Sequence, residues 1–236
     1  RARQYSSIFS SNLSAVMQRV TFPVLATFQD DKMELVSKYR IIVKSLMLMS
    51  GFCMVALACT AKPIVILTIG EKWTQAIIFL QILCFNDILY PIRNVNTNII
   101  QVTGRSDLIL KLTVIKRLLQ SISIVLGIFN IFYLLYGLVI VNTIGTVLNA
   151  KFASRCIPYS LREQIKDISK PLGICLLCGL VMYSISYIPV NLIIRLILQL
   201  SVGIICFFIL AKITKLNEFY FMRDLILEQI LKLKRR

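Results

Sequence analysis

The residues between 86 and 101 have the types and the spacing needed to surround a polar ligand. Eight of them fall within an arc of roughly 140° when placed on a helix at about 100° per residue. They are Asn86, Asp87, Tyr90, Arg93, Asn94, Thr97, Asn98 and Gln101. Amides and hydroxyls both donate and accept hydrogen bonds, and a guanidinium group binds anions. We interpret this polar stripe as one wall of a path for a polar substrate.

The segment that carries the stripe, residues 76–102, is otherwise as apolar as a membrane span. The whole chain is 57% hydrophobic, with a mean hydropathy of +0.78, whereas soluble domains are nearer 45–50% apolar. A charge at the centre of a bilayer costs about 2.5–3.5 kcal/mol on insertion scales and therefore faces protein or a wet cavity. The sequence thus predicts an all-α, polytopic transmembrane helix bundle and excludes a soluble enzyme.

Long apolar runs divide the chain into about seven predicted spans. They lie at residues 8–28, 41–59, 76–102, 118–132, 136–152, 171–188 and 192–211. Together they form one membrane region, residues 1–211, followed by a basic amphipathic tail at residues 212–236. Of the 27 Lys and Arg residues, 20 fall on one side of this topology and five on the other. The positive-inside rule then places the C-terminus in the cytoplasm.

Two other predicted spans carry polar faces that could form a second wall of the path. Ser14 and Gln18 share a face of the first span, and Arg19 lies beside it as the second deep cation after Arg93. Asn142 and Asn149 share a face of the span at residues 136–152. Two other interpretations stay open, because polar residues also join packed membrane helices and an arginine near a helix end can extend to the headgroups.

The two charges of the stripe allow a structural alternative to substrate binding. Asp87 and Arg93 could form a buried ion pair while the amides bond to other helices. Their separation of six residues is poor for direct pairing on one regular helix, unless Pro91 kinks the helix and brings them together. Asp87 could instead titrate and couple transport to an ion whose identity the sequence does not give.

Several chemistries are excluded or disfavoured by composition. The chain has no histidine, which removes histidine catalysis and histidine metal ligands. Cys175 and Cys178 form a CxxC pattern inside an apolar run with no second ligand pair, so we expect packing residues, no metal and no disulfide. The net charge of +16 fits loops that set topology better than a nucleic-acid surface. We expect no catalytic residues, no cofactor and no enzymatic activity.

Three segments, taken in order, resemble bacterial polysaccharide-biosynthesis membrane proteins. They are Asn12–Leu25 followed by Asp30, then Ala61–Val65 with Gly70-Glu71-Lys72-Trp73, and then the turn Gly104-Arg105-Ser106-Asp107. The resemblance covers roughly residues 1–155 and points to oligosaccharide flippases of the Wzx type. That superfamily also includes MATE drug exporters and lipid II flippases.

The resemblance implies a fold and a function. The chain would be the C-terminal lobe of a MATE-like, two-lobe transporter in a bacterial cytoplasmic membrane, with an N-terminal lobe of the same protein as its partner. Its substrate would be an isoprenoid-diphosphate-linked oligosaccharide, used for surface polysaccharide or O-antigen biosynthesis. The protein, surrounded by membrane lipids, would move this substrate across the membrane by alternating access. The alternatives are a MATE-like exporter of small organic substrates and a membrane-embedded glycan ligase or transferase; the short outer links disfavour the last.

Overall fold

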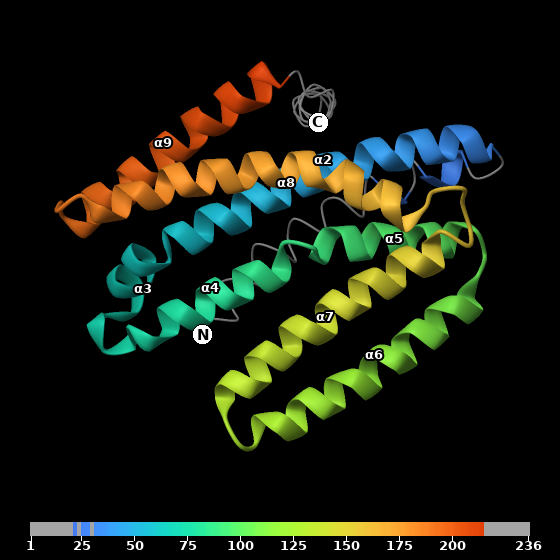
Figure 1. Cartoon of the computed structure of the whole chain (residues 1–236), viewed down its shortest axis with the longest axis horizontal. Helices are drawn as coiled ribbons and strands as arrows, with labels where there is room; N and C mark the ends of the chain where they lie inside the picture. Colours follow the sequence, from blue (N-terminus) through green and yellow to red (C-terminus); the bar gives the residue numbers. More distant parts are fainter. Residues whose placement is uncertain (1–20, 23–24, 29–30, 215–236) are drawn as a thin grey trace, which may run out of the picture.

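The computed structural model describes residues 21–22, 25–28 and 31–214, and these residues form a bundle of antiparallel helices. Figure 1 shows their order along the chain. The helices are α2 (Lys32–Cys59), α3 (Ala61–Ile69), α4 (Gln75–Asp87), α5 (Tyr90–Val102), α6 (Ser106–Gly127), α7 (Ile131–Ala153), α8 (Leu161–Ser184) and α9 (Leu192–Ile213), with short 3₁₀ turns at Glu71–Trp73 and Ile185–Tyr187. The predicted all-α, polytopic fold class is confirmed.

Within the described residues, five stretches are long and apolar enough to cross a membrane: Lys32–Cys59, Gln75–Val102, Ile131–Ala153, Leu161–Tyr187 and Leu192–Ile213. The helix α6 is of similar length but is interrupted by charged side chains, and it does not meet that criterion. The first predicted span, residues 8–28, lies mostly outside the described residues. The predicted tail, residues 212–236, lies outside them from residue 215 onward.

The chain runs back and forth along the bundle, with α5 continuing in the direction of α4, so most of the connections collect at its two ends (Figure 1). One end holds the start of α2, the α5–α6 turn and the α7–α8 link; we call it the basic end, because Lys32, Arg105 and Arg155 lie there. The other end holds the α3–α4 connection, the α6–α7 turn and the α8–α9 link. The fold therefore gathers at one end the described links that the charge count assigns to one side of the membrane.

Helix caps explain why several helices start earlier than the predicted spans. Asp31 accepts hydrogen bonds from the amides of Met33 and Glu34 and begins α2 well before residue 41. Ser160 and Glu163 form a reciprocal capping box that begins α8 ten residues before Pro171. The caps therefore move both starts into segments that the sequence analysis assigned to polar links.

The predicted span at residues 118–132 also needs correction. The helix α6 ends at Gly127, and Asn130 accepts a hydrogen bond from the amide of Phe132 and starts α7 at Ile131. The last residues of that predicted span therefore belong to the next helix.

The predicted span at residues 76–102 is two helices with a break at residues 88–89. Pro91 lies in the first turn of α5, where its missing N–H group costs nothing in hydrogen bonds. The Ser50 hydroxyl of α2 donates to the carbonyl of Ile88 at 3.2 Å. A neighbouring helix therefore supplies a hydrogen-bond donor to a carbonyl at the break.

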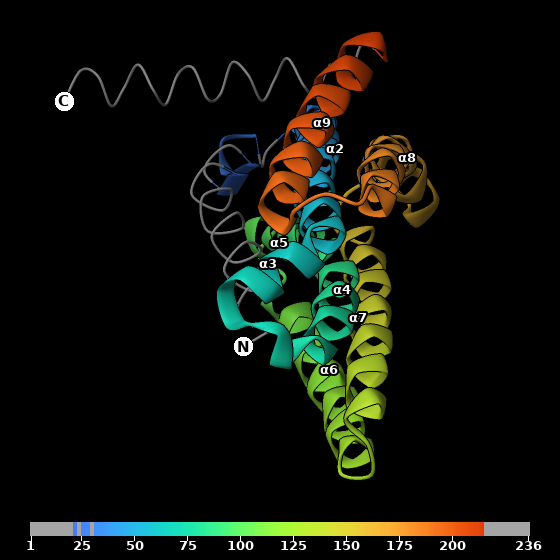
Figure 2. The ribbon, with the colours of Figure 1, turned by 90° about the vertical axis from the view of Figure 1, so that its left-hand side faces the viewer.

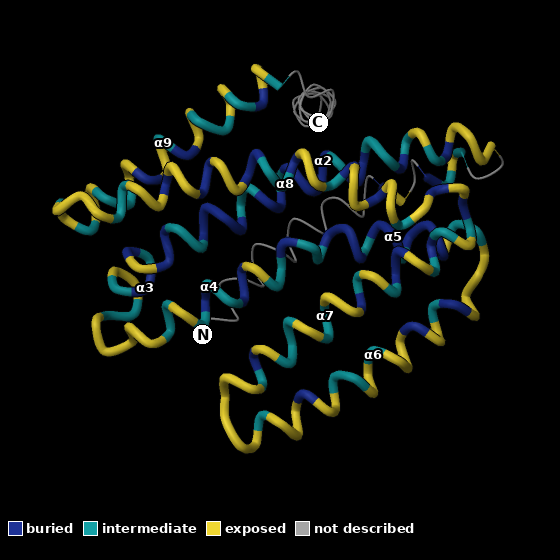
Figure 3. The backbone as a smooth tube through the Cα atoms, viewed as in Figure 1, coloured by how far each residue is buried: buried dark blue, intermediate teal, exposed yellow. Residues whose placement is uncertain are grey.

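Two apolar clusters hold the bundle together. One lies between α2, α4 and α8 and the other between α2, α5 and the start of α6. The α6–α7 hairpin extends away from this core (Figure 2), and most of its surface is exposed (Figure 3). Its two helices approach closely at Gly137, where an added Cβ would lie 2.8 Å from Ser123 Oγ. Exposed Ile, Leu and Phe side chains on this hairpin suit contact with lipid.

Candidate functional site: a cationic pocket between α5, α6 and α7

The stripe on α5 faces a pocket of about 280 Å³, near the lower end of the range for small-molecule sites. Three helices line it, each with polar side chains. The lining residues are Tyr90, Arg93, Asn94 and Thr97 from α5; Thr113, Lys116, Arg117 and Gln120 from α6; and Leu138, Val141, Asn142, Gly145 and Asn149 from α7. The pocket is therefore built from the core helix α5 and the α6–α7 hairpin.

Arg93 is a buried cation at the centre of the α5 wall, with 9% of its surface exposed. Its Nη1 donates to the carbonyl oxygen of Asn142 at 3.2 Å. Its guanidinium lies 5.4 Å from the ring centroid of Tyr90, within the range of a cation–π contact. These contacts occupy one of its nitrogens and one of its faces.

Lys116 brings a second cation to the pocket from α6. Its Nζ donates to Asn149 Oδ1 at 2.8 Å, and Asn149 Nδ2 donates to the carbonyl oxygen of Arg93 at 3.2 Å. Asn149 thus joins α6, α7 and α5 through one side chain. The stem of Lys116 lies across Gly145, where an added Cβ would be 3.2 Å from Lys116 Cε. Because Gly145 has no side chain, the stem of Lys116 can pack against the α7 backbone there.

The lining carries three cations and no Asp or Glu. The third cation, Arg117, is on the exposed side of α6 and donates to Gln120 Oε1 at 3.4 Å. Asp87, which does not line the pocket, interacts electrostatically with Arg93. Because like charges repel in a low-dielectric membrane, an anion bound among the lining cations lowers the free energy of the site. Amide and hydroxyl groups beside the cations can bond to a hydroxylated ligand. Among the described residues, no group of three or more His, Cys, Asp or Glu side chains could hold a metal ion.

The structure brings four of the predicted site residues together: Arg93, Asn94, Asn142 and Asn149 line the same pocket. Asn86 is one contact away, since its Oδ1 accepts from Asn142 Nδ2 at 2.9 Å.

The remaining predicted residues do not line the pocket. Asp87 accepts from Asn86 Nδ2 at 2.9 Å, Asn98 is buried, and Gln101 is exposed. Three further predicted residues lie outside the described residues: Ser14, Gln18 and Arg19.

Four pocket residues on α6 were missed by the sequence analysis. Thr113, Lys116, Arg117 and Gln120 recur at intervals of three and four residues, which places them on one helical face. Lys116 and Arg117 directly precede the predicted span at residues 118–132, so their charges count toward the basic side of the predicted topology. The helical spacing of the four polar residues was the signal that could have identified this wall.

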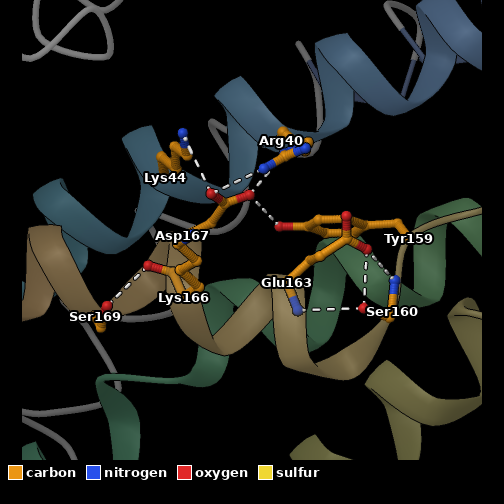
Figure 4. A network of polar contacts seen from close by, with 8 residues as sticks. All are labelled: Arg40, Lys44, Tyr159, Ser160, Glu163, Lys166, Asp167 and Ser169. Atoms are coloured by element: carbon orange, nitrogen blue, oxygen red, sulfur yellow. Dashed lines mark hydrogen bonds and ion pairs between the residues drawn. The ribbon is translucent and has the colours of Figure 1, made fainter.

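A second polar cluster, also missed, lies at the basic end (Figure 4). Asp167 of α8 is buried and accepts from Arg40 Nε at 2.7 Å and from the Tyr159 hydroxyl at 2.7 Å. Lys44 Nζ lies 3.4 Å from its other oxygen. Burial and the adjacent Asp167 carboxylate raise the pKa of Tyr159, so its hydroxyl stays protonated and remains a donor. This cluster joins α2, α8 and the α7–α8 link.

Comparison with known proteins gives matches to polysaccharide-biosynthesis proteins. Residues 1–78 match a family model described as "Polysaccharide biosynthesis protein". The lipopolysaccharide biosynthesis protein WzxC of Escherichia coli (strain K12) is 27% identical over 139 residues, which are 58% of this chain and 28% of WzxC. The teichuronic acid biosynthesis protein TuaB of Bacillus subtilis (strain 168) is 22% identical over 218 residues, which are 89% of this chain and 45% of TuaB.

A third relative is an uncharacterized membrane protein in the cps region of Klebsiella pneumoniae, 26% identical over 106 residues, which are 45% of this chain and 22% of that protein. The chain spans less than half the length of these relatives. No solved structure matches it significantly. The apolar helices and these matches confirm the resemblance read from the motifs: the chain is a multi-pass membrane protein related to the polysaccharide-biosynthesis membrane proteins.

Proposed function

We propose that this chain is part of a flippase that moves an isoprenoid-diphosphate-linked oligosaccharide across a bacterial cytoplasmic membrane. The observation that carries the proposal is the pocket between α5, α6 and α7. It places Arg93, Lys116 and Arg117 beside several amides, with no acidic side chain in its lining. A diphosphate needs cationic donors, and sugar hydroxyls need groups that both donate and accept. The relation to polysaccharide-biosynthesis membrane proteins supports the same substrate class.

The two buried or half-buried cations suit the phosphate end of the substrate. Arg93 keeps nitrogens beyond the one bonded to Asn142 and can therefore donate to phosphate oxygens. Lys116 can exchange its bond to Asn149 for a bond to the same anion. Asn94 and Asn142 then lie beside the bound phosphate, where they can bond to the first sugar. The basic end faces the cytoplasm in this proposal, with the C-terminus on the same side.

The same pocket disfavours the alternative that the chain exports small organic cations. A cationic substrate would be repelled by a lining that carries three positive side chains and no acidic one. We accordingly assign transport and no catalysis to the site. Alternating access against a second lobe, coupled to an ion, completes the proposed transport cycle.

Flipping by Arg93 variants tests the proposal. The intact protein is reconstituted in vesicles with lipid-linked oligosaccharide, and its flipping is measured for Arg93→Ala and Arg93→Lys at matched protein levels. We expect Arg93→Ala to lower the rate about tenfold or more, the value of one charge-assisted hydrogen bond. Arg93→Lys should be intermediate, because it keeps the charge and loses the planar fork.

The matched control is Thr143→Ala, on an exposed part of α7 outside the pocket lining, which should flip at the wild-type rate. Wild-type rates in both Arg93 variants would overturn the role of the pocket.

A further inference from the structure

The helix α5 also has a polar contact on the side that faces the core. Asn96 is fully buried, and its Oδ1 accepts a hydrogen bond from the hydroxyl of Tyr39 on α2. Its Nδ2 lies 3.5 Å from Gln164 Oε1 on α8, a longer contact. One amide of α5 is therefore held between two neighbouring helices.

The direction of Asn96 determines the direction of the pocket residues. Adjacent residues on a helix point about 100° apart, so an α5 that turns Asn96 toward α2 must turn Thr97 toward the α6–α7 side. Arg93 lies one turn below Thr97 on the same face, and the Thr97 hydroxyl donates to the Arg93 carbonyl at 2.9 Å. Fixing the rotation of α5 at Asn96 therefore fixes where Arg93 enters the pocket.

Contacts of α5 with the neighbouring helices contribute to its rotation, together with its connection to α4. The break at residues 88–89 interrupts the regular helix between the two segments. The core-facing residues Val95, Ile99 and Ile100 pack through apolar contacts, which have little directional preference. A buried amide bonded to a fixed hydroxyl has one satisfied orientation, and rotation would leave both groups unpaired.

The donor is itself held in place. The ring of Tyr39 packs edge-on against Tyr159, with centroids 5.5 Å apart. The Tyr159 hydroxyl donates to Asp167, which also binds Arg40 of α2 (Figure 4). A chain of contacts thus runs from the Asp167 cluster at the basic end to the helix that carries Arg93.

We propose that Asn96 is a positioning residue that acts with Tyr39: it sets the rotation of α5 so that Arg93 and Thr97 face the pocket. The claim about rotation stands on the contacts of α2, α5 and α8. The consequence for transport rests on the proposed function.

Cysteine accessibility on α5 tests the rotation without any transport measurement. In the intact protein, all native cysteines, including the seven of this chain, are replaced by alanine. Single cysteines are then placed at Thr97, on the pocket side, and at Val95, on the core side. A water-soluble methanethiosulfonate reagent should label Thr97→Cys much faster than Val95→Cys. Adding Asn96→Leu, which keeps the size and removes the hydrogen bonds, should lower this ratio of labelling rates about tenfold.

Two further variants give the comparison its controls. Tyr39→Phe keeps the ring and removes the donor; it should lower the ratio by about fivefold, the value of one hydrogen bond. Gln199→Leu removes a different buried amide, one that joins α9 to α8 and α2, and should leave the ratio unchanged. An unchanged ratio in both Asn96→Leu and Tyr39→Phe would overturn the proposal, as would an equal fall in Gln199→Leu.

Transport separates this proposal from the one on which it rests. If Arg93 is a substrate ligand, Asn96→Leu should also lower the flipping rate about tenfold, and Gln199→Leu should not. If Arg93→Ala flips normally while Asn96→Leu still shifts the labelling ratio, the assigned substrate site is wrong and the positioning role of Asn96 stands.

Discussion

Replacement of Asp167 by alanine should destabilise the protein more than any other single change in the basic-end cluster. Its carboxylate is 8% exposed and accepts from Arg40 and Tyr159, with Lys44 nearby. Removing one partner from a buried charge pair costs about 3–5 kcal/mol. Because the Arg40 side chain is 40% exposed and can turn toward water or headgroups, we lower the expected cost to about 2–3 kcal/mol.

Thermal unfolding with a thiol-reactive dye measures this cost directly. The cysteines are free thiols, and Cys84, Cys175 and Cys178 are buried until the helices separate. At about 2–4 °C per kcal/mol for a domain of this size, Asp167→Ala should lower the midpoint by about 5–10 °C.

Two other variants should lose less stability than Asp167→Ala. Asp167→Asn keeps one acceptor oxygen and should lose about 1–2 kcal/mol. Lys44→Met should lose less than about 1 kcal/mol, since its contact is long and partly exposed. A wild-type midpoint for Asp167→Ala, or a larger loss for Lys44→Met than for Asp167→Ala, would refute the reasoning.

Two glycines on α7 give further predictions. Gly137→Ala should destabilise the α6–α7 hairpin by about 1–3 kcal/mol, because the new Cβ would lie 2.8 Å from Ser123 Oγ. The control Gly173→Ala in α8, with nothing within 4 Å of its Cβ, should leave the melting midpoint unchanged or raise it. A lower midpoint for Gly173→Ala than for Gly137→Ala would contradict the close packing of α6 against α7. Gly145→Leu should fill the pocket and displace Lys116, and it should lower flipping about tenfold. Gly137→Ala, which also disturbs the hairpin but lies outside the pocket lining, controls for the loss of stability; normal flipping by Gly145→Leu would exclude the pocket from the substrate path.

Hydropathy predicted the helical membrane fold because five of the described apolar stretches are long enough to span a bilayer, and a helix satisfies its own backbone hydrogen bonds. The limits of the helices were less predictable, since they depend on caps. Asp31 and Ser160 lie in polar segments that read as links, and only their hydrogen bonds to nearby amides reveal helix starts. Pro91 predicted a disturbed backbone, but its sequence context did not show that Ser50 would bond to the Ile88 carbonyl.

The candidate site was predictable on the two helices whose polar residues interrupt apolar runs. Arg93, Asn142 and Asn149 stand out because a membrane span has few other reasons to carry them. Lys116 and Asp167 did not stand out, since charged residues near predicted links are expected for topology. Their roles depend on which helices pack together, and no local pattern carries that information.

The most direct test of the central claim is whether the pocket recognises a diphosphate. Binding of radiolabelled geranylgeranyl diphosphate to the intact protein is compared with competition by geranylgeraniol, which has the same chain and no charge. If Arg93 and Lys116 bind phosphate oxygens, the diphosphate should bind about 100-fold more tightly, from about tenfold or more for each charged contact. In the double variant Arg93→Met, Lys116→Met that preference should fall to about threefold or less. The exposed Arg117 accounts for the preference that remains. Equal binding of the two probes by the wild-type protein, or an unchanged preference in the double variant, would contradict the assignment.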